Sequence, residues 1–147
     1  MKIFIPIVAF CIIMGACKSS SGSAGKQPES ITEKYWKLVE INGKQVVLDE
    51  SSKGAFIILK NEDNRVNGSG GCNTFNGTYQ LDEAALRIRF SQMVSTMMAC
   101  LNMEVENELM RVLEMADNYA MSPDGKNLFL NRARMAPLAK FEVIYLK

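Results

Sequence analysis

Residues 66–79 read VNGSGGCNTFNGTY, the densest pattern in the chain. Glycines this frequent beside a strand mark a bulge or a close approach of two backbones, where a larger side chain would clash. Asn73 and Asn76 can bond to nearby backbone groups and hold irregular turns, and Thr78 and Tyr79 resume a strand. No helix N-terminus follows to supply a dipole, which disfavours a phosphate-binding glycine loop. The stretch therefore predicts two kinked strands that pack closely.

Short strand patterns separated by turn residues extend to both sides of this stretch. The alternation is clearest at 86–90, where Leu86, Ile88 and Phe90 alternate with arginines. Asn42-Gly43 and the polar run at 61–64 supply turn signals. We expect strands at 35–41, 44–48, 55–59, 65–71, 74–81, 86–90, 118–121, 128–130 and 141–146.

Residues 102–116 change to a helical period. The apolar residues at helical spacing are Leu101, Val105, Leu109, Val112 and Leu113. Such a stripe packs on a sheet, Asn102 is placed to be the N-cap, and Glu104 and Glu106 suit the positive end of the helix dipole. The expected fold is α+β and mainly β. It is an antiparallel curled sheet, or a partly open barrel, of about eight strands with one packed α-helix.

The first seventeen residues have the layout of a bacterial lipoprotein signal. Lys2 precedes an apolar run at 3–13, and Gly15-Ala16 directly precede Cys17. Small residues before a cysteine match a lipobox, in which the cysteine thiol carries the lipid. An uncleaved membrane helix is the alternative, but the run is shorter than the roughly 20 apolar residues that span a bilayer.

The chain therefore divides into a signal peptide at 1–16, a lipidated N-terminus and flexible tether at 17–30, and one domain at 31–147. The tether prediction rests on its Ser, Gly, Lys, Gln and Pro content. We expect a lipid-anchored protein of the cell envelope, in the outer membrane and facing the periplasm. Lys18, rather than aspartate, follows the lipidated cysteine, which fits outer-membrane sorting.

Charge and histidine content exclude several classes of function. The chain has 17 basic and 16 acidic residues and no histidine. A balanced domain lacks the basic face that binds nucleic acid and the polybasic segment that binds anionic lipid, so attachment would come from the lipid anchor. Ser-His-Asp and Cys-His catalytic sites need an imidazole, as do histidine-based zinc and copper sites. We expect a monomer that is not an enzyme and holds no cofactor or metal.

The four cysteines have distinct expected fates. Cys11 leaves with the signal peptide and Cys17 carries lipid. Cys72 and Cys100 remain as a pair in an oxidising compartment, where disulfides persist, so we expect them to be joined. A redox-active pair is the alternative, but the spacing lacks the C-x-x-C pattern that lowers the pKa of a thiol.

Methionine is frequent, with ten in the chain. Those around Cys100 and the predicted helix are Met93, Met97, Met98, Met103, Met110 and Met115. Methionine fills irregular cores and adaptable binding surfaces, and we expect core filling here because 97–99 is apolar. Thioethers together with a thiolate could instead hold Cu(I).

Several of these features together resemble the META/HslJ-like domain of bacterial envelope lipoproteins. The matching residues are Trp36, Gly71, Cys72, Asn73, Gly77, Tyr79, Thr96, Ala99 and Cys100. Together with Leu38, the Asn42-Gly43 turn, Asp124-Gly125 and Leu128, they run in order through nearly all of 31–147. The resemblance implies a compact β-rich domain with a helix against the sheet and no established catalytic activity. It also implies roles in heat or antibiotic stress and in envelope upkeep; such domains also occur beside copper-stress lipoprotein modules.

Three functions therefore remain open. The first is a non-enzymatic envelope lipoprotein that binds a partner, which requires an exposed apolar patch. The second is a barrel that holds a small apolar ligand against Phe56, Phe75 and Phe90, which requires a cavity of roughly 300–1,000 Å³. The third is a copper-stress module, which requires converging methionine sulfurs that solvent can reach.

Overall fold

The computed structural model describes residues 29–48 and 54–145. The predicted signal peptide, the lipidated Cys17 and most of the predicted tether lie outside the described residues. None of the helices in the described ranges has the length and apolar character needed to cross a bilayer.

Within these ranges the chain forms nine strands, one α-helix and a short 3-10 helix. The strands are β1 (Tyr35–Ile41), β2 (Lys44–Gln45), β3 (Ala55–Lys60), β4 (Arg65–Gly70), β5 (Thr74–Asp82), β6 (Arg87–Ser95), β7 (Asn118–Met121), β8 (Asn127–Asn131) and β9 (Ala139–Ile144). The helices are η1 (Glu62–Asn64) and α1 (Glu104–Met115). This confirms the expected mainly β fold with one α-helix.

All strand pairs are antiparallel, and the sheet order is β6-β5-β4-β3-β1-β9-β8-β7, with β2 paired to β1. The sheet curls, so its two end strands approach each other. There the amide of Tyr119 in β7 donates a hydrogen bond of 3.0 Å to the carbonyl of Leu86, just before β6. The result is a partly open barrel, as the strand pattern predicts.

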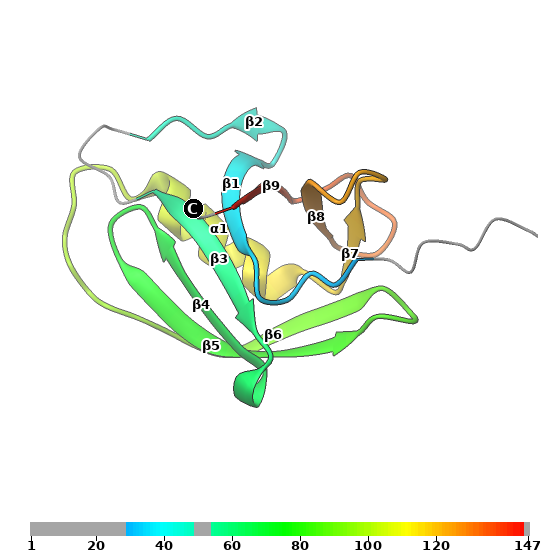
Figure 1. Cartoon of the computed structure of the whole chain (residues 1–147). Coiled ribbons are helices and arrows are strands. Elements are labelled where there is room, and N and C mark those ends of the chain that lie inside the picture. Colours follow the sequence, from blue (N-terminus) through cyan, green and yellow to red (C-terminus); the bar gives the residue numbers. More distant parts are fainter. Residues whose placement is uncertain (1–28, 49–53, 146–147) are drawn as a thin grey trace, which may run out of the picture.

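Helix α1 lies behind β1 and β3 in Figure 1, on the concave side of the curled sheet, and packs against β1, β4 and β6. Its buried apolar residues are Leu109, Val112 and Leu113, which belong to the predicted stripe. They meet a core in which Trp36 is fully buried. The Trp36 indole Nε1 donates to the carbonyl of Ile31 at 2.8 Å, so the ring is buried without losing its hydrogen bond.

Several boundaries differ from the sequence predictions, and those of β2, β6 and α1 differ for a physical reason. The predicted strand at 44–48 ends after Gln45, because its register with β1 covers Glu40 and Ile41. A hydrogen bond of 3.0 Å from the Val46 amide to the Val39 carbonyl follows but does not extend the strand. Strand β6 runs five residues beyond the predicted end at 90, across a bulge at Gln92, where φ is 52°. The bulge interrupts the two-residue period, which is why alternation does not reveal the second half of the strand.

The start of α1 also differs from the prediction. The helix begins at Glu104, and Met103 rather than Asn102 occupies the N-cap position. Asn102 still accepts a hydrogen bond of 3.1 Å from the Glu104 amide through its side-chain oxygen. Leu101, predicted to lie on the buried stripe, precedes the helix and is exposed.

Candidate functional site

The segment between β6 and α1, residues 96–103, is called here the β6–α1 loop. It has no regular secondary structure. A disulfide between Cys72 and Cys100, with 6.2 Å between the two Cα atoms, joins it to the β4–β5 turn. The two predicted disulfide cysteines therefore meet in the structure and fix the loop near its middle.

The side chain of Asn73 holds the same loop from inside. Its Oδ1 accepts hydrogen bonds from the Thr96 hydroxyl at 2.7 Å and from the Met98 amide at 2.8 Å. Its Nδ2 donates to the Met98 carbonyl at 3.1 Å. Together with the disulfide, these bonds fix the loop backbone at three positions. The asparagine and threonine of the family motif thus act as one hydrogen-bonded unit.

Glu106, in the first turn of α1, completes this unit and was not singled out by the sequence analysis as a site residue. Its carboxylate is buried and accepts from the Asn73 backbone amide at 2.6 Å and from Asn73 Nδ2 at 2.7 Å. The positive end of α1 adds to the stabilisation of this charge. A glutamate three residues before Leu109, on the buried stripe, is the signal that could have identified it.

Gly70 at the end of β4 makes this geometry possible. A Cβ atom there would lie 2.8 Å from the Glu106 Cα. Real side chains do not approach a backbone this closely, so any larger residue would push α1 away from the sheet. The glycines of the 66–79 stretch therefore allow the close approach that their density predicts.

The end of β6 and the β6–α1 loop expose large apolar side chains. Met97 is 97% exposed, Leu101 is fully exposed, and Val94 and Met98 are 57% and 49% exposed. The core-filling hypothesis is therefore wrong for Met97 and Met98. It holds in part for Met93 and Met110, which pack against the core. These four exposed residues, Val94, Met97, Met98 and Leu101, are called here the apolar patch.

The remaining motif residues are spread over the fold. Gly77 lies opposite the β6 bulge, where a Cβ atom would be 2.9 Å from the Ser91 carbonyl oxygen and 2.5 Å from Met93 Sδ. The Tyr79 ring is buried, and its hydroxyl donates to the Lys60 carbonyl at 3.0 Å. The Gly71 amide donates to Ser69 Oγ at 3.1 Å, and Ala99 is exposed in the loop. Trp36, Gly77 and Tyr79 thus act through packing and backbone geometry.

The three phenylalanines proposed to line a ligand cavity do not share one. Phe75 is buried in the core, whereas Phe56 lies on the opposite face of the sheet and stacks on Tyr35, with ring centroids 4.4 Å apart. Phe90 is half-buried at the edge of the core. Alternation along β3 explains the difference, since Ala55 and Ile57 on either side of Phe56 are buried.

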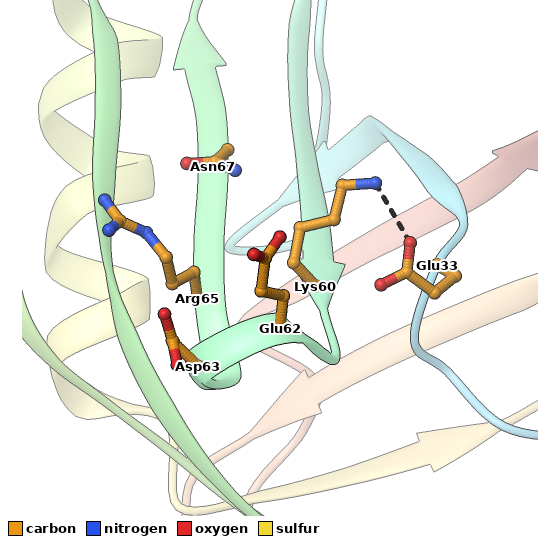
Figure 2. A pocket seen from close by; sticks show the side chains of 6 residues that line it. All are labelled: Glu33, Lys60, Glu62, Asp63, Arg65 and Asn67. Atoms are coloured by element: carbon orange, nitrogen blue, oxygen red, sulfur yellow. Dashed lines mark hydrogen bonds and ion pairs between the residues drawn. The ribbon is translucent and has the colours of Figure 1, made fainter.

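A polar depression of about 530 Å³ lies beside the β3–β4 connection. Figure 2 shows its lining side chains, which are Glu33, Lys60, Glu62, Asp63, Arg65 and Asn67. Glu33 pairs with Lys60 at 2.9 Å and accepts from the Asn61 amide at 2.7 Å. These two contacts, the amide bond first, lower the pKa of Glu33 below its ordinary value.

Two other depressions are also open. One of about 720 Å³ is lined mostly by polar residues, among them Ser30, Thr32 and Glu83, and one of about 210 Å³ lies beside Leu81 and Arg89. These depressions do not match the apolar cavity that a ligand-binding barrel requires. Within the described ranges, no group of three or more Cys, Asp and Glu side chains is placed to hold a metal ion. Cys100 is in the disulfide, so it offers no thiolate to Cu(I).

Comparison with known proteins places this geometry in a family. The META domain family matches residues 29–143, which confirms the resemblance. No curated protein matches the chain. A solution structure of a protein from Burkholderia xenovorans superimposes with a TM-score of 0.57 at 18% identity, covering 77% of this chain and 83% of that one.

A second solved structure shares the fold. It is a DUF4847 family protein from Bacteroides vulgatus, with a TM-score of 0.51 at 17% identity, covering 76% of this chain and 92% of that one. At these identities both structures support the fold alone. The family match spans well over half of the sequence and includes the disulfide, Asn73 and Glu106. The chain belongs to the META domain family.

Proposed function

We propose that this META domain protein is a non-enzymatic lipoprotein of the cell envelope that binds a partner through the apolar patch. In this role it supports envelope maintenance or resistance to heat or antibiotic stress. The observation that carries the proposal is the patch itself, which places Met97 and Leu101 in full contact with solvent. Large apolar side chains that are exposed together on one short segment, as at 94–101, mark candidate sites of interaction.

The fixed conformation of the β6–α1 loop supports a role of the apolar patch in binding a partner. The Cys72–Cys100 disulfide and three hydrogen bonds to Asn73 fix the backbone that carries the patch. A loop that is already ordered loses little conformational entropy when a partner covers it, so more of the contact energy remains as affinity.

The envelope location rests on the N-terminal signal. The order of Lys2, the apolar run, Gly15-Ala16 and Cys17 is that of a lipoprotein precursor. A disulfide in the domain fits the same oxidising compartment. We propose no catalytic role, because the chain has no histidine and its sequence carries none of the usual catalytic motifs. Labelling with a palmitate analogue tests the anchor, since a Cys17→Ser variant should lose the label.

Complementation tests the proposed function. A strain lacking the gene would receive the wild-type chain, a Met97→Ser/Leu101→Ser variant, or a Val47→Ser/Met135→Ser control. Val47 and Met135 are also exposed apolar residues but lie outside the patch. We expect the control to restore growth under heat and envelope-directed antibiotics, and the patch variant to fail while folding normally. Full complementation by a folded patch variant would exclude the proposed role of the patch.

A further inference from the structure

We infer that the apolar patch docks into an apolar groove on a second protein, and that the rim of that groove carries lysine or arginine. This inference rests on the proposed function and names the class of partner. A lipid bilayer and a second copy of this chain are the other candidates. Three observations favour the protein groove.

The shape of the site fits a groove. The patch projects from a loop, and its most exposed members, Met97 and Leu101, lie in the part joined by Cys100 to the β4–β5 turn. A projecting, fixed apolar loop is complementary to a concave apolar surface. The unbranched methionine side chains can adjust to the walls of such a groove.

The charge around the patch favours a basic rim. Residues 91–103 contain no charged side chain. The first charge after them is Glu104, which is exposed at the start of α1 and makes no ion pair with any residue that the structure describes. Carboxylates at the edge of an interface attract lysine or arginine on the partner. They also repel an anionic bilayer surface, which makes lipid a poorer occupant.

The position of the patch in the fold also disfavours the anchoring membrane. The first described residues lie beside the β7–β8 turn, where a Cβ on Gly125 would be 2.5 Å from Glu29 Oε2. Figure 1 shows the β6–α1 loop at the opposite side of the domain. The patch therefore lies on the side of the domain away from the point where the predicted tether joins it.

The two polar depressions described above offer a second copy no matching apolar surface. They are lined mainly by polar and charged side chains, including Glu33, Arg65 and Glu83. Burying Met97 or Leu101 against those groups would remove the polar side chains from water without giving them hydrogen bonds.

Site-specific photocrosslinking in intact cells tests the inference. p-Benzoylphenylalanine would replace Met97 in the full-length lipoprotein, with replacement of Met135 as the matched control. We expect a light-dependent adduct of one discrete polypeptide at position 97 and none at 135. The adduct supports the inference only if the purified polypeptide binds the purified full-length protein, and Leu101→Ser weakens that binding by about tenfold to a hundredfold.

The charge variants test the rim. Glu104→Lys should weaken the binding severalfold and Glu104→Gln by less, and added salt should reduce the difference between wild type and Glu104→Gln. Met135→Ser should leave the affinity unchanged. If neither Glu104 variant nor added salt changes the affinity in this way, the inference that the rim of the groove carries lysine or arginine is overturned.

Other outcomes separate the partner class from the function. Leu101-dependent flotation with phosphatidylethanolamine–phosphatidylglycerol vesicles would show that the patch binds lipid. An adduct at position 97 of twice the protein's own mass would show that it binds a second copy. Either result would overturn the inference that the partner is a protein with an apolar groove, and would leave the proposed binding function standing. Absence of any adduct while the patch variant still fails to complement would also overturn it. Absence of an adduct together with full complementation would remove the proposed function as well.

Discussion

Asn73 and Glu106 form a two-point contact that ties the sheet to the helix. The Asn73 backbone amide donates to Glu106 Oε2 at 2.6 Å, and its side-chain Nδ2 donates to Oε1 at 2.7 Å. The other side-chain atom of Asn73, Oδ1, accepts from Thr96 and Met98 in the β6–α1 loop. One asparagine thus sets the positions of α1 and of the loop that carries the apolar patch.

Removing the Glu106 carboxylate should destabilise the domain strongly. Glu106→Ala leaves the buried Asn73 amide without an acceptor and leaves Nδ2 with the Met98 carbonyl alone, at an expected cost of about 2–4 kcal/mol in the free energy of unfolding. Glu106→Gln keeps one acceptor and should cost less. Urea unfolding followed by the fluorescence of Trp36, the only tryptophan, measures both changes. Glu104→Ala, on the exposed side of the same turn, is the control and should change stability by less than about 0.5 kcal/mol.

Loss of the disulfide should lower stability and free the loop. The bond joins residues 28 positions apart, and the chain-entropy estimate for a loop of this size is about 3.5 kcal/mol. Cys72→Ser/Cys100→Ser should therefore lose about that much stability in urea unfolding, and the wild type should lose the same amount when reductant is added. Titration of thiols in unfolded protein, before and after reduction, provides the check on the bond itself. An unchanged midpoint in the double variant would contradict this account.

Gly77→Ala should disturb the β5–β6 pairing. The new methyl group would lie 2.9 Å from the Ser91 carbonyl oxygen and 2.5 Å from Met93 Sδ. Overpacking of this kind costs about 1–3 kcal/mol. Adding Met93→Ala removes one of the two clashes, so the double variant should lose less stability than the sum of the single variants. Strict additivity in urea unfolding would show that Met93 and the methyl group do not meet.

Acid should weaken the connection that follows β8. The Ala133 amide donates to Asp117 Oδ1 at 2.8 Å. This bond, with smaller contributions from the Asn118 side chain and from Arg87 and Arg89, lowers the pKa of Asp117 below its ordinary value of 3.8. The unfolded chain then binds more protons than the folded one at acid pH. The stabilisation is full above pH 3.8 and is lost as the pH falls through the lower, folded pKa.

The measurement for this prediction is the urea midpoint between pH 6 and pH 2.5. Asp117→Asn should lower the midpoint at pH 6 and should flatten its decline below pH 4. Glu33 and Asp124 also have lowered pKa values and remain in the variant, so part of the decline persists. A decline identical to that of the wild type would exclude Asp117 as a contributor.

Strand positions could largely be predicted from the sequence. Alternation at 86–90 and the turn at Asn42-Gly43 correctly indicate antiparallel strands, and Leu109, Val112 and Leu113 correctly indicate the buried face of α1. These predictions succeed because burial of one face of a strand or helix imposes a regular period on the sequence. The cysteine count and the expected compartment likewise indicate the pairing of Cys72 with Cys100.

The β6–α1 loop could not be predicted in this way. Met97 and Leu101 have the composition of core residues, and only the packing of β6, the β4–β5 turn and α1 leaves them in water. A loop has no repeating pattern that distinguishes an inward from an outward side chain. The role of Glu106 depends on Asn73, which is 33 residues away in the chain.

The sequence alone therefore determined the family, the mainly β architecture and the cysteine pair, because each depends on residue type, local period or matched spacing. The tertiary structure decided which of the methionines are buried, which carboxylate holds Asn73, and which surface is available to a partner. Those outcomes depend on contacts between segments that the chain brings together only when the sheet curls around α1.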